Sequence, residues 1–209
     1  MFWRILVLLA AMSGAGIVQA AEPVRGIPGQ DVVVSLIHDG EERNFVLHLP
    51  TGYDGEQLIP LLIGVHGYSG TGARLENQYM QIFDHINENH YIGVFPDGMT
   101  ASAEAPWARG FNDLGSRNDS GPDGLTCVPP PYEYPFFENC PDADRERQCY
   151  WGNSCADDLG FFRKMIEHVR DNYSVDPRRI YMTGHSQGGS TINGLAAGLD
   201  DLLAAVAPV

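Results

Sequence analysis

The chain has 209 residues, of which 44% are hydrophobic and 19% are charged. That composition suits one domain with an apolar core and excludes a fibrous or intrinsically disordered protein. The formal net charge of −14 argues against nucleic acid or an anionic membrane face as a partner, because both attract positive surfaces. We therefore expect a neutral or apolar ligand.

Residues 1–20 have the pattern of a cleaved signal peptide. Arg4 precedes the apolar run of residues 5–12, and small residues surround a cleavage position near Ala20. The alternative is a membrane anchor, but the run is short for a bilayer span and is followed by Ser13 and Gly14. We expect residues 21–209 to form an exported domain, secreted or periplasmic, with no membrane partner after cleavage.

The four cysteines lie within one stretch of 29 residues. An even number in an exported chain predicts two disulfides, and the pairing stays open. A zinc site is the alternative, but the spacings of 13, 9 and 6 residues contain no C-x-x-C pair. We expect no metal and no cofactor. The residues concerned are Cys127, Cys140, Cys149 and Cys155.

The N-terminal half predicts a hairpin followed by a β-α-β unit. Residues 31–37 and 43–50 are β-rich and flank an Asp-Gly turn signal, and residues 59–67 form a continuous apolar run typical of a central strand. Residues 73–89 predict one helix, and residues 91–98 return to a strand pattern. The apolar stripe of that helix is Leu75, Tyr79, Ile82, Phe83 and Ile86.

Residues 97–155 lose this periodicity and predict a loop insertion tied by the disulfides. The alternation then resumes with a helix over 156–173, with Asp157 and Asp158 in its first turn. A strand over 178–184, a helix over 187–199 and a strand over 204–209 follow. Strands that alternate with helices predict an α/β fold with a mostly parallel sheet and helices on both faces.

Residues 184–188, Gly-His-Ser-Gln-Gly, match the pattern G-x-S-x-G at a strand-to-helix junction. In a sharp turn of this kind the serine hydroxyl is pushed out at the end of the sheet, so Ser186 is the candidate nucleophile. The alternative is an ordinary strand-to-helix loop. The strand ending at Gly184 and the small-residue helix after it favour the nucleophile.

A serine nucleophile needs fixed donors for the oxyanion that forms. The backbone N–H of Gln187, at a helix start, is one candidate. The other is the N–H of Tyr68, in the loop after residues 59–67, where we expect Gly67 to free the backbone to turn. The alternative for His66-Gly67 is a plain strand-terminating turn.

A base for Ser186 is harder to find in the sequence. In this arrangement an acid and then a histidine follow the serine along the chain, but no histidine follows Ser186. We expect His185 to point into the structure, no pattern places His66 against Ser186, and Asp200 and Asp201 are expected to cap a helix end. The remaining histidines, expected at the surface or in the core, are His38, His48, His85, His90 and His168.

From about Phe45 to Val209 the chain resembles secreted α/β-hydrolase esterases of the polyhydroxybutyrate depolymerase, feruloyl esterase and acetylxylan esterase type. The resemblance rests on "PLLIGVHGYSGTG", "YIGVFPDG", "CADDLGFFRKMIEHVRDNYSVDPRRIYMTGHSQGG" and "LAAVAPV". It implies the α/β-hydrolase fold, Ser186 as acyl-forming nucleophile and the Tyr68 and Gln187 amides as oxyanion hole. The family's catalytic Asp and His lie on later strands, so the chain resembles its N-terminal two thirds.

The insertion should lie over the site, because it follows a strand at the carboxyl edge of the sheet. Its aromatic side chains either hold an apolar acyl or phenolic group or merely pack the loop. Calcium ligands without EF-hand spacing are a weaker possibility at Asp113, Asn118, Asp119 and Asp123. The aromatic residues are Trp107, Phe111, Tyr132, Tyr134, Phe136, Phe137, Tyr150 and Trp151.

Together these features predict an exported serine carboxylic-ester hydrolase that acts on a polymeric or aryl ester. The catalytic acid and base are expected to lie outside residues 1–209. The alternative is a non-catalytic relative that uses the loop over the sheet to bind polysaccharide or polyester.

Overall fold

The structure is a computed structural model that describes residues 25–114, 129–142 and 150–209. The predicted signal peptide lies outside the described residues. Among those that are described, no helix is long and apolar enough to cross a membrane.

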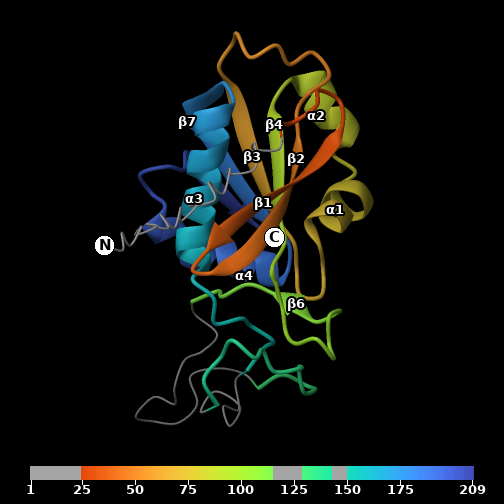
Figure 1. Cartoon of the computed structure of the whole chain (residues 1–209), viewed down its shortest axis with the longest axis vertical. Coiled ribbons are helices and arrows are strands. Elements are labelled where there is room, and N and C mark those ends of the chain that lie inside the picture. Colours follow the sequence, from red (N-terminus) through yellow and green to blue (C-terminus); the bar gives the residue numbers. More distant parts are fainter. Residues whose placement is uncertain (1–24, 115–128, 143–149) are drawn as a thin grey trace, which may run out of the picture.

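A six-stranded sheet with the order β1-β2-β4-β3-β7-β8 forms the centre of the molecule (Figure 1). β1 pairs antiparallel with β2, and β2 with β4, whereas β4, β3, β7 and β8 are mutually parallel. The prediction of a mostly parallel sheet with β3 inside it is confirmed. The strands are β1 (Asp31–His38), β2 (Glu41–His48), β3 (Ile59–Val65), β4 (Ile92–Pro96), β7 (Val175–Gly184) and β8 (Ala205–Pro208).

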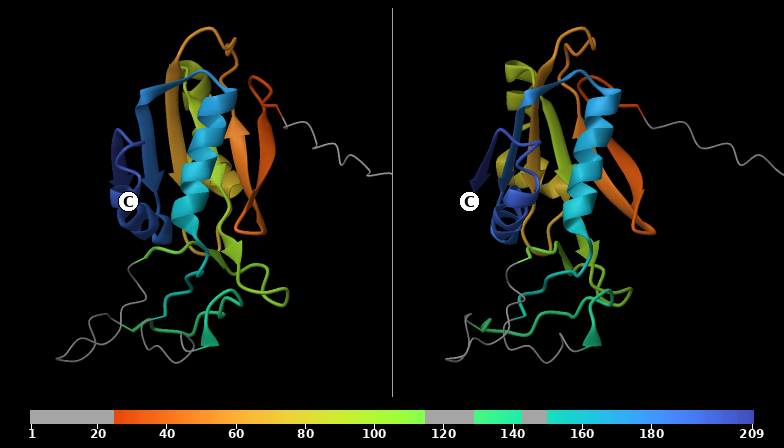
Figure 2. Two further views of the ribbon diagram at one scale, coloured as in Figure 1. Left: turned by 60° about the vertical axis from the view of Figure 1, so that its left-hand side comes forward. Right: turned by 90° about the vertical axis from the view of Figure 1, so that its left-hand side faces the viewer.

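Helices cover both faces of the sheet (Figure 2). One face packs against α3 (Asp158–Asn172) and α4 (Gln187–Leu195), which continues as the 3₁₀ turn η3 (Ala196–Gly198). The other face packs against α1 (Gly72–Arg74), η1 (Leu75–Met80) and α2 (Phe83–Asn89). Both sets bury apolar side chains against the strands, and this burial drives the folding of the layers.

The hairpin forms as predicted, with Asp39 and Gly40 at its turn in left-handed backbone conformations. The single helix predicted over residues 73–89 is wrong. The segment contains a π-helix, and Gln81 (φ 48°) ends it before α2 begins. Tyr79, predicted as part of the apolar stripe, is 61% exposed, whereas Leu75 and Ile86 are buried.

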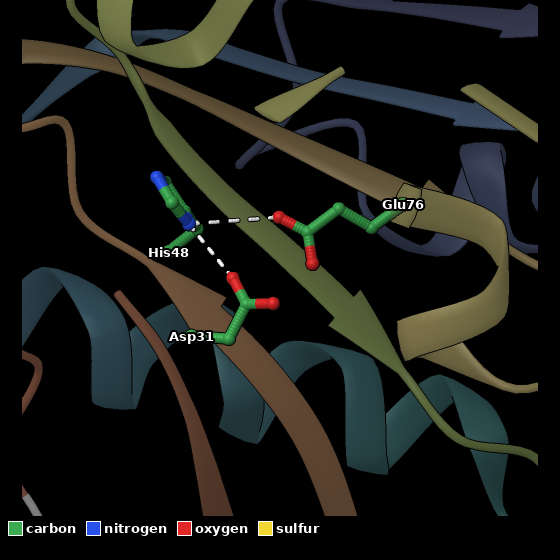
Figure 3. A group of neighbouring side chains, drawn as sticks. All are labelled: Asp31, His48 and Glu76. Carbon is green, nitrogen blue, oxygen red and sulfur yellow. Dashed lines mark hydrogen bonds and ion pairs between the residues drawn. The ribbon is translucent and has the colours of Figure 1, made fainter. Parts of the chain in front are cut away.

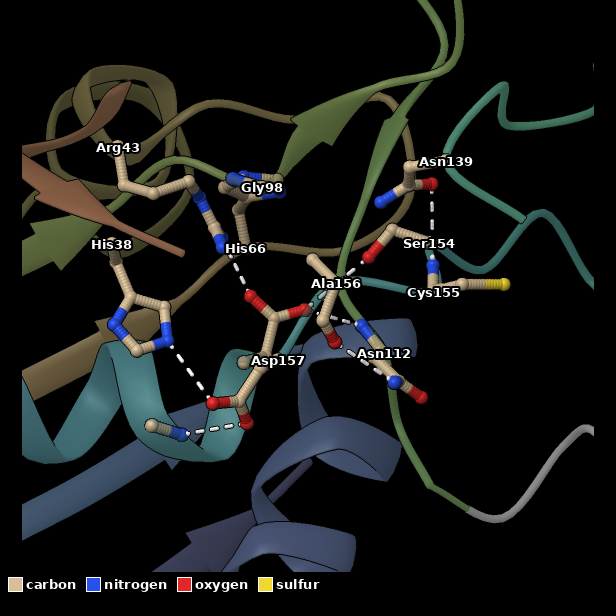
Figure 4. A network of polar contacts seen from close by, with 12 residues as sticks. His38, Arg43, His66, Gly98, Asn112, Asn139, Ser154, Cys155, Ala156 and Asp157 are labelled. Carbon is tan, nitrogen blue, oxygen red and sulfur yellow. Dashed lines mark hydrogen bonds and ion pairs between the residues drawn. The ribbon is translucent and has the colours of Figure 1, made fainter. Parts of the chain in front are cut away.

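A polar network joins the loop insertion to the start of α3 (Figure 4). Asp157 is the helix N-cap and accepts the Gly160 N–H, while Asp158 is fully buried and bonds Arg43 of β2 at 2.5 Å. Asp158 also accepts the Asn112 N–H at 2.6 Å. The network therefore fixes the insertion against the sheet.

The described parts of the insertion lie beyond the ends of β3, β4 and β7 (Figure 1). They contain a two-stranded ribbon of β5 (Met99–Thr100) and β6 (Arg109–Gly110) and a disulfide between Cys140 and Cys155. The disulfide confirms one of the two bridges expected from the cysteine count. Cys127 and Cys149 lie outside the described residues.

Candidate active site

Ser186 stands at the sharp junction between β7 and α4. Its backbone has φ 55° and ψ −121°, a region that non-glycine residues seldom occupy. Such local strain is concentrated at functional sites, and this turn holds the Ser186 side chain exposed at the end of the sheet. The predicted alternative of an ordinary loop does not account for this backbone conformation.

The glycines of the motif are required by close backbone contacts. A Cβ on Gly184 would lie 2.3 Å from the Gly188 oxygen, and one on Gly188 would lie 2.2 Å from the Val65 oxygen of β3. No side chain fits at either position. The start of α4 therefore lies directly against the ends of β7 and β3, which places Ser186 beside the loop after β3.

A pocket of about 270 Å³ opens in front of Ser186. The loop after β3 lines one side of it, and Tyr79 of η1 and Tyr132 of the insertion line others. A second, more apolar pocket of about 330 Å³ adjoins it between η1 and the end of β8. The two pockets share Leu75, Tyr79 and His185, so an apolar group has room beside the serine.

Of the two predicted oxyanion donors, Tyr68 lines this pocket and Gln187 follows Ser186 directly at the start of α4. Among the described residues, neither the Tyr68 N–H nor the Gln187 N–H donates a hydrogen bond, so both remain available to a ligand. Gly67 comes close to the serine, since a Cβ there would lie 3.1 Å from Ser186 Cβ. A glycine is therefore required at position 67 by this close approach to Ser186. The residue of the loop with a left-handed backbone conformation is Ser69 (φ 62°).

The side chain of Gln187 anchors the start of α4 to the insertion. Its Nε2 donates to Asn153 Oδ1 at 2.6 Å and to the Gly152 carbonyl at 3.2 Å. Position 187 therefore combines a free backbone donor with a side chain that fixes the backbone.

His66 is buried and does not reach the serine. Its Nδ1 lies 2.7 Å from the Gly67 carbonyl, and its Nε2 lies 3.0 Å from the Gly98 N–H. These contacts define a neutral imidazole that donates from Nδ1 and accepts at Nε2. Burial lowers the pKa of His66 to about 4, so it is neutral at physiological pH and both nitrogens are engaged.

The prediction that His185 points into the structure is wrong. Its side chain is exposed and stacks on Tyr79, with ring centroids 5.8 Å apart. Within the described ranges no histidine forms a hydrogen bond with Ser186 Oγ. The two acids after α4 have other surroundings. Asp201 pairs with Arg163 at 2.8 Å, and Asp200 is exposed.

The aromatic residues of the insertion divide between the two predicted roles. Tyr132 and Tyr134 line the pocket, and Tyr134 packs edge-on against Tyr68 with centroids 4.7 Å apart. The Tyr68 hydroxyl is buried without a partner among the described residues, and burial raises its pKa to about 12. The others pack the loop or lie away from the pocket: Trp107, Phe111, Phe136, Phe137, Tyr150 and Trp151.

Three helical residues of the pocket were not predicted to lie there. Arg74 reaches it from α1, and Leu75 and Tyr79 from η1, directly after the loop that carries Tyr68. The only signal for them was their place after that loop. Of the weaker calcium candidates, Asp113 accepts a hydrogen bond from Asn153 at 2.9 Å, and Asn118, Asp119 and Asp123 lie outside the described residues.

This fold has counterparts among solved esterase structures. No family model matches the chain. Feruloyl esterase B of Piromyces equi is 28% identical over 166 residues, which are 79% of this chain and 23% of that protein. The chain therefore spans about a quarter of the length of this curated relative.

Solved esterase structures share the fold. A thermostable esterase superposes with a TM-score of 0.51 at 19% identity, covering 85% of this chain and 40% of the other. Acetyl xylan esterase from Aspergillus awamori gives 0.51 at 14% identity, covering 84% and 50%. The chain has the α/β-hydrolase fold, and the resemblance to esterases of the feruloyl and acetylxylan type is confirmed.

Proposed function

We propose that Ser186 is the nucleophile of an exported carboxylic-ester hydrolase. The observation that carries the proposal is the strained backbone of Ser186 at a pocket that Tyr68 also lines, together with the unengaged N–H groups of Tyr68 and Gln187. Oxyanion stabilisation of this kind is commonly the largest catalytic contribution in acyl transfer. The similarity to esterases supports the same reaction class.

The reaction would proceed by double displacement. Ser186 Oγ attacks the ester carbonyl carbon, the oxyanion is held by the Tyr68 and Gln187 N–H groups, and the alcohol leaves with a proton. Water then attacks the acyl-enzyme, releases the acid and restores the serine. We place the histidine that moves these protons, and the acid that orients it, outside residues 1–209.

For the substrate we propose an aryl or acetyl ester carried by a polysaccharide. Tyr68, Tyr132 and Tyr134 surround the pocket with aromatic faces that suit a phenolic acyl group. The named activity of the relative, a feruloyl esterase, supports this choice over an aliphatic polyester. The acidic net charge favours a neutral ester in the same way.

The test compares Ser186→Ala with Ser190→Ala in the product of the complete gene, using p-nitrophenyl acetate and a feruloyl ester. Ser190 lies exposed one turn further along α4 and serves as the matched control. We expect Ser186→Ala to lower kcat by at least about 10³-fold and Ser190→Ala to leave it near the wild-type value. Equal activity of Ser186→Ala and wild type would contradict the proposal.

A second measurement addresses the base. Residues 1–209 alone should give neither steady turnover nor an initial burst of p-nitrophenol. Ser186-dependent release by this piece would show that it contains a working base, with His66 the first to examine. If the complete product binds polysaccharide or polyester without hydrolysing esters, the non-catalytic alternative is correct.

A further inference from the structure

Three ligand-type side chains, from β1, β2 and η1, meet in a cluster (Figure 3). None of the three lines the Ser186 pocket. Asp31 is the first residue of β1 and His48 the last of β2, and they are direct partners in the antiparallel register. Paired residues of this kind present their side chains on the same face of the sheet. Glu76 reaches them from η1, the helix that covers this face.

Glu76 is the unusual member of this cluster. Its side chain is completely buried, and both carboxylate oxygens lack a hydrogen-bond partner among the described residues. Because a buried carboxylate without a partner is strongly unfavourable, the site needs either a proton or a cation.

The surroundings of His48 define which nitrogen faces the carboxylates. Nδ1 lies 2.8 Å from Asp31 Oδ1 and 3.7 Å from Glu76 Oε1, while Nε2 faces Asn87 Oδ1 at 3.5 Å. Asn87 is itself fixed, since its Oδ1 accepts the Thr51 N–H at 2.8 Å. An oxygen acceptor behind the second ring nitrogen is the usual support for a metal-bound histidine.

We propose that Asp31, His48 and Glu76 form a binding site for a divalent transition-metal cation, with Zn²⁺ the best fit. One imidazole nitrogen and two carboxylates are typical zinc ligands, and two carboxylates balance the charge of the ion. The three ligand atoms lie within 4.8 Å of one another. Ligands of one tetrahedral zinc are roughly 3.3–3.5 Å apart, so the widest separation would have to shorten by up to roughly 1.5 Å, shared between two side chains.

Other cations fit this cluster less well. Calcium takes six to eight oxygen ligands and magnesium keeps a nearly octahedral shell of oxygens, and neither favours imidazole.

A zinc ion here would join β1, β2 and η1. Because η1 also carries Leu75 and Tyr79 to the serine pocket, the ion would fix one wall of that pocket. The site itself is independent of the reaction proposed for Ser186.

The test measures zinc binding to the complete gene product after removal of metals with a chelator. We expect one zinc per chain by elemental analysis and a rise in Tm of roughly 5–10 °C at zinc concentrations about 100 times the Kd. With Co²⁺ in place of zinc, the visible absorption of a low-coordinate ion should appear. The variants are Glu76→Gln and Asp31→Asn. The matched control is Glu88→Gln, because Glu88 is an exposed residue of α2.

Both variants should lose most of the Tm rise and the cobalt spectrum, whereas Glu88→Gln should keep both. Asp31 is 34% exposed, so Asp31→Asn carries the test if Glu76→Gln fails to fold. Absence of stoichiometric zinc in the wild type would overturn the proposal and leave a proton shared by Glu76 and Asp31. A rise in Tm that survives in both variants would overturn it equally, by showing that zinc binds elsewhere.

Discussion

His66 shows how one buried side chain shapes the site without taking part in the reaction. It is 1% exposed and connects the end of β3 with the loop after β4 through its contacts with Gly67 and Gly98. Its ring also packs against Phe111, with centroids 4.8 Å apart. His66 therefore holds in place the loop that presents the Tyr68 N–H.

Because His66 is buried in its neutral form, the free energy of unfolding depends on pH within a defined range. The pKa of His66 is about 4 in the folded chain and 6.5 in the unfolded chain, so the unfolded state binds the proton first as the pH falls. The stability that neutral His66 contributes is fully present above about pH 6.5 and is lost progressively as the pH falls to about 4. Between pH 7.5 and 5 this group alone should cost about 2 kcal/mol of unfolding free energy.

The measurement is urea unfolding of the wild type and His66→Gln at both pH values. The wild type should lose about 2 kcal/mol more than the variant, because the other titrating groups are common to both proteins. Equal losses in the two proteins would show that His66 titrates as an exposed histidine does.

The sequence predicted some residues of the site better than others. The Gly-x-Ser-x-Gly pattern indicated the turn at Ser186, since glycines at those spacings have a local steric reason. The exposed position of His185 depends on its stacking against Tyr79, which is 106 residues away. The cluster of Asp31, His48 and Glu76 likewise depends on strand register and a helix from another segment, and neither has a local signature.

At the scale of elements, the segment between β3 and β4 departs most from its predicted form. Regular α-helical spacing placed Leu75 and Tyr79 in one buried stripe, but the segment forms a π-helix that ends at Gln81. Leu75 and Glu76 are buried and Tyr79 is exposed, although Leu75 and Tyr79 both line the serine pocket. π-Helical turns occur frequently at functional sites, and this one serves both the serine pocket and the proposed metal cluster.

The junction of β7 and α4 is an element whose geometry permits a direct test. Gly184→Ala places a Cβ 2.3 Å from the Gly188 carbonyl oxygen, and a backbone atom cannot move aside cheaply. We expect a loss of at least about 1–3 kcal/mol in unfolding free energy. Gly52→Ala is the control, because the nearest atom to its Cβ would be in the His90 ring at 3.5 Å. Denaturant unfolding that gives equal values for both variants would contradict this description of the junction.

Most other elements could be predicted because their patterns are local and strong. β1, β2, β3, β4 and α3 each combine an apolar period with a clear start or stop signal. The small ribbon of β5 and β6 could not be predicted, since each strand is two residues long and is held by pairing alone.

At the scale of the whole molecule, the sheet has two unlike edges. Among the described residues each edge strand has one partner: β1 is the outer strand of a hairpin with β2, and β8 pairs parallel with β7 and is mostly exposed. An exposed apolar edge strand invites pairing with another chain. A mostly parallel sheet could be expected from the alternation of elements, but the order of the strands and the exposure of this edge required the structure.

This edge predicts the behaviour of residues 21–209 produced alone. We expect self-association in size-exclusion chromatography with light scattering, and a larger monomer fraction for Ala207→Lys, since lysine on an edge strand opposes pairing. Ala207 is exposed, so the substitution should leave the core intact. A monodisperse wild-type sample that melts cooperatively would show that this edge does not cause self-association.

The contacts of Gln187 have a practical consequence for handling the protein. They tie the start of α4 to residues 152 and 153, which lie just before the cysteine bridged to Cys140. Thiol reductants such as dithiothreitol, often added during purification, would reduce that disulfide and loosen the contacts that fix the proposed oxyanion donor. In assays of the proposed reaction, preparations kept free of reductants should give the more reproducible rates.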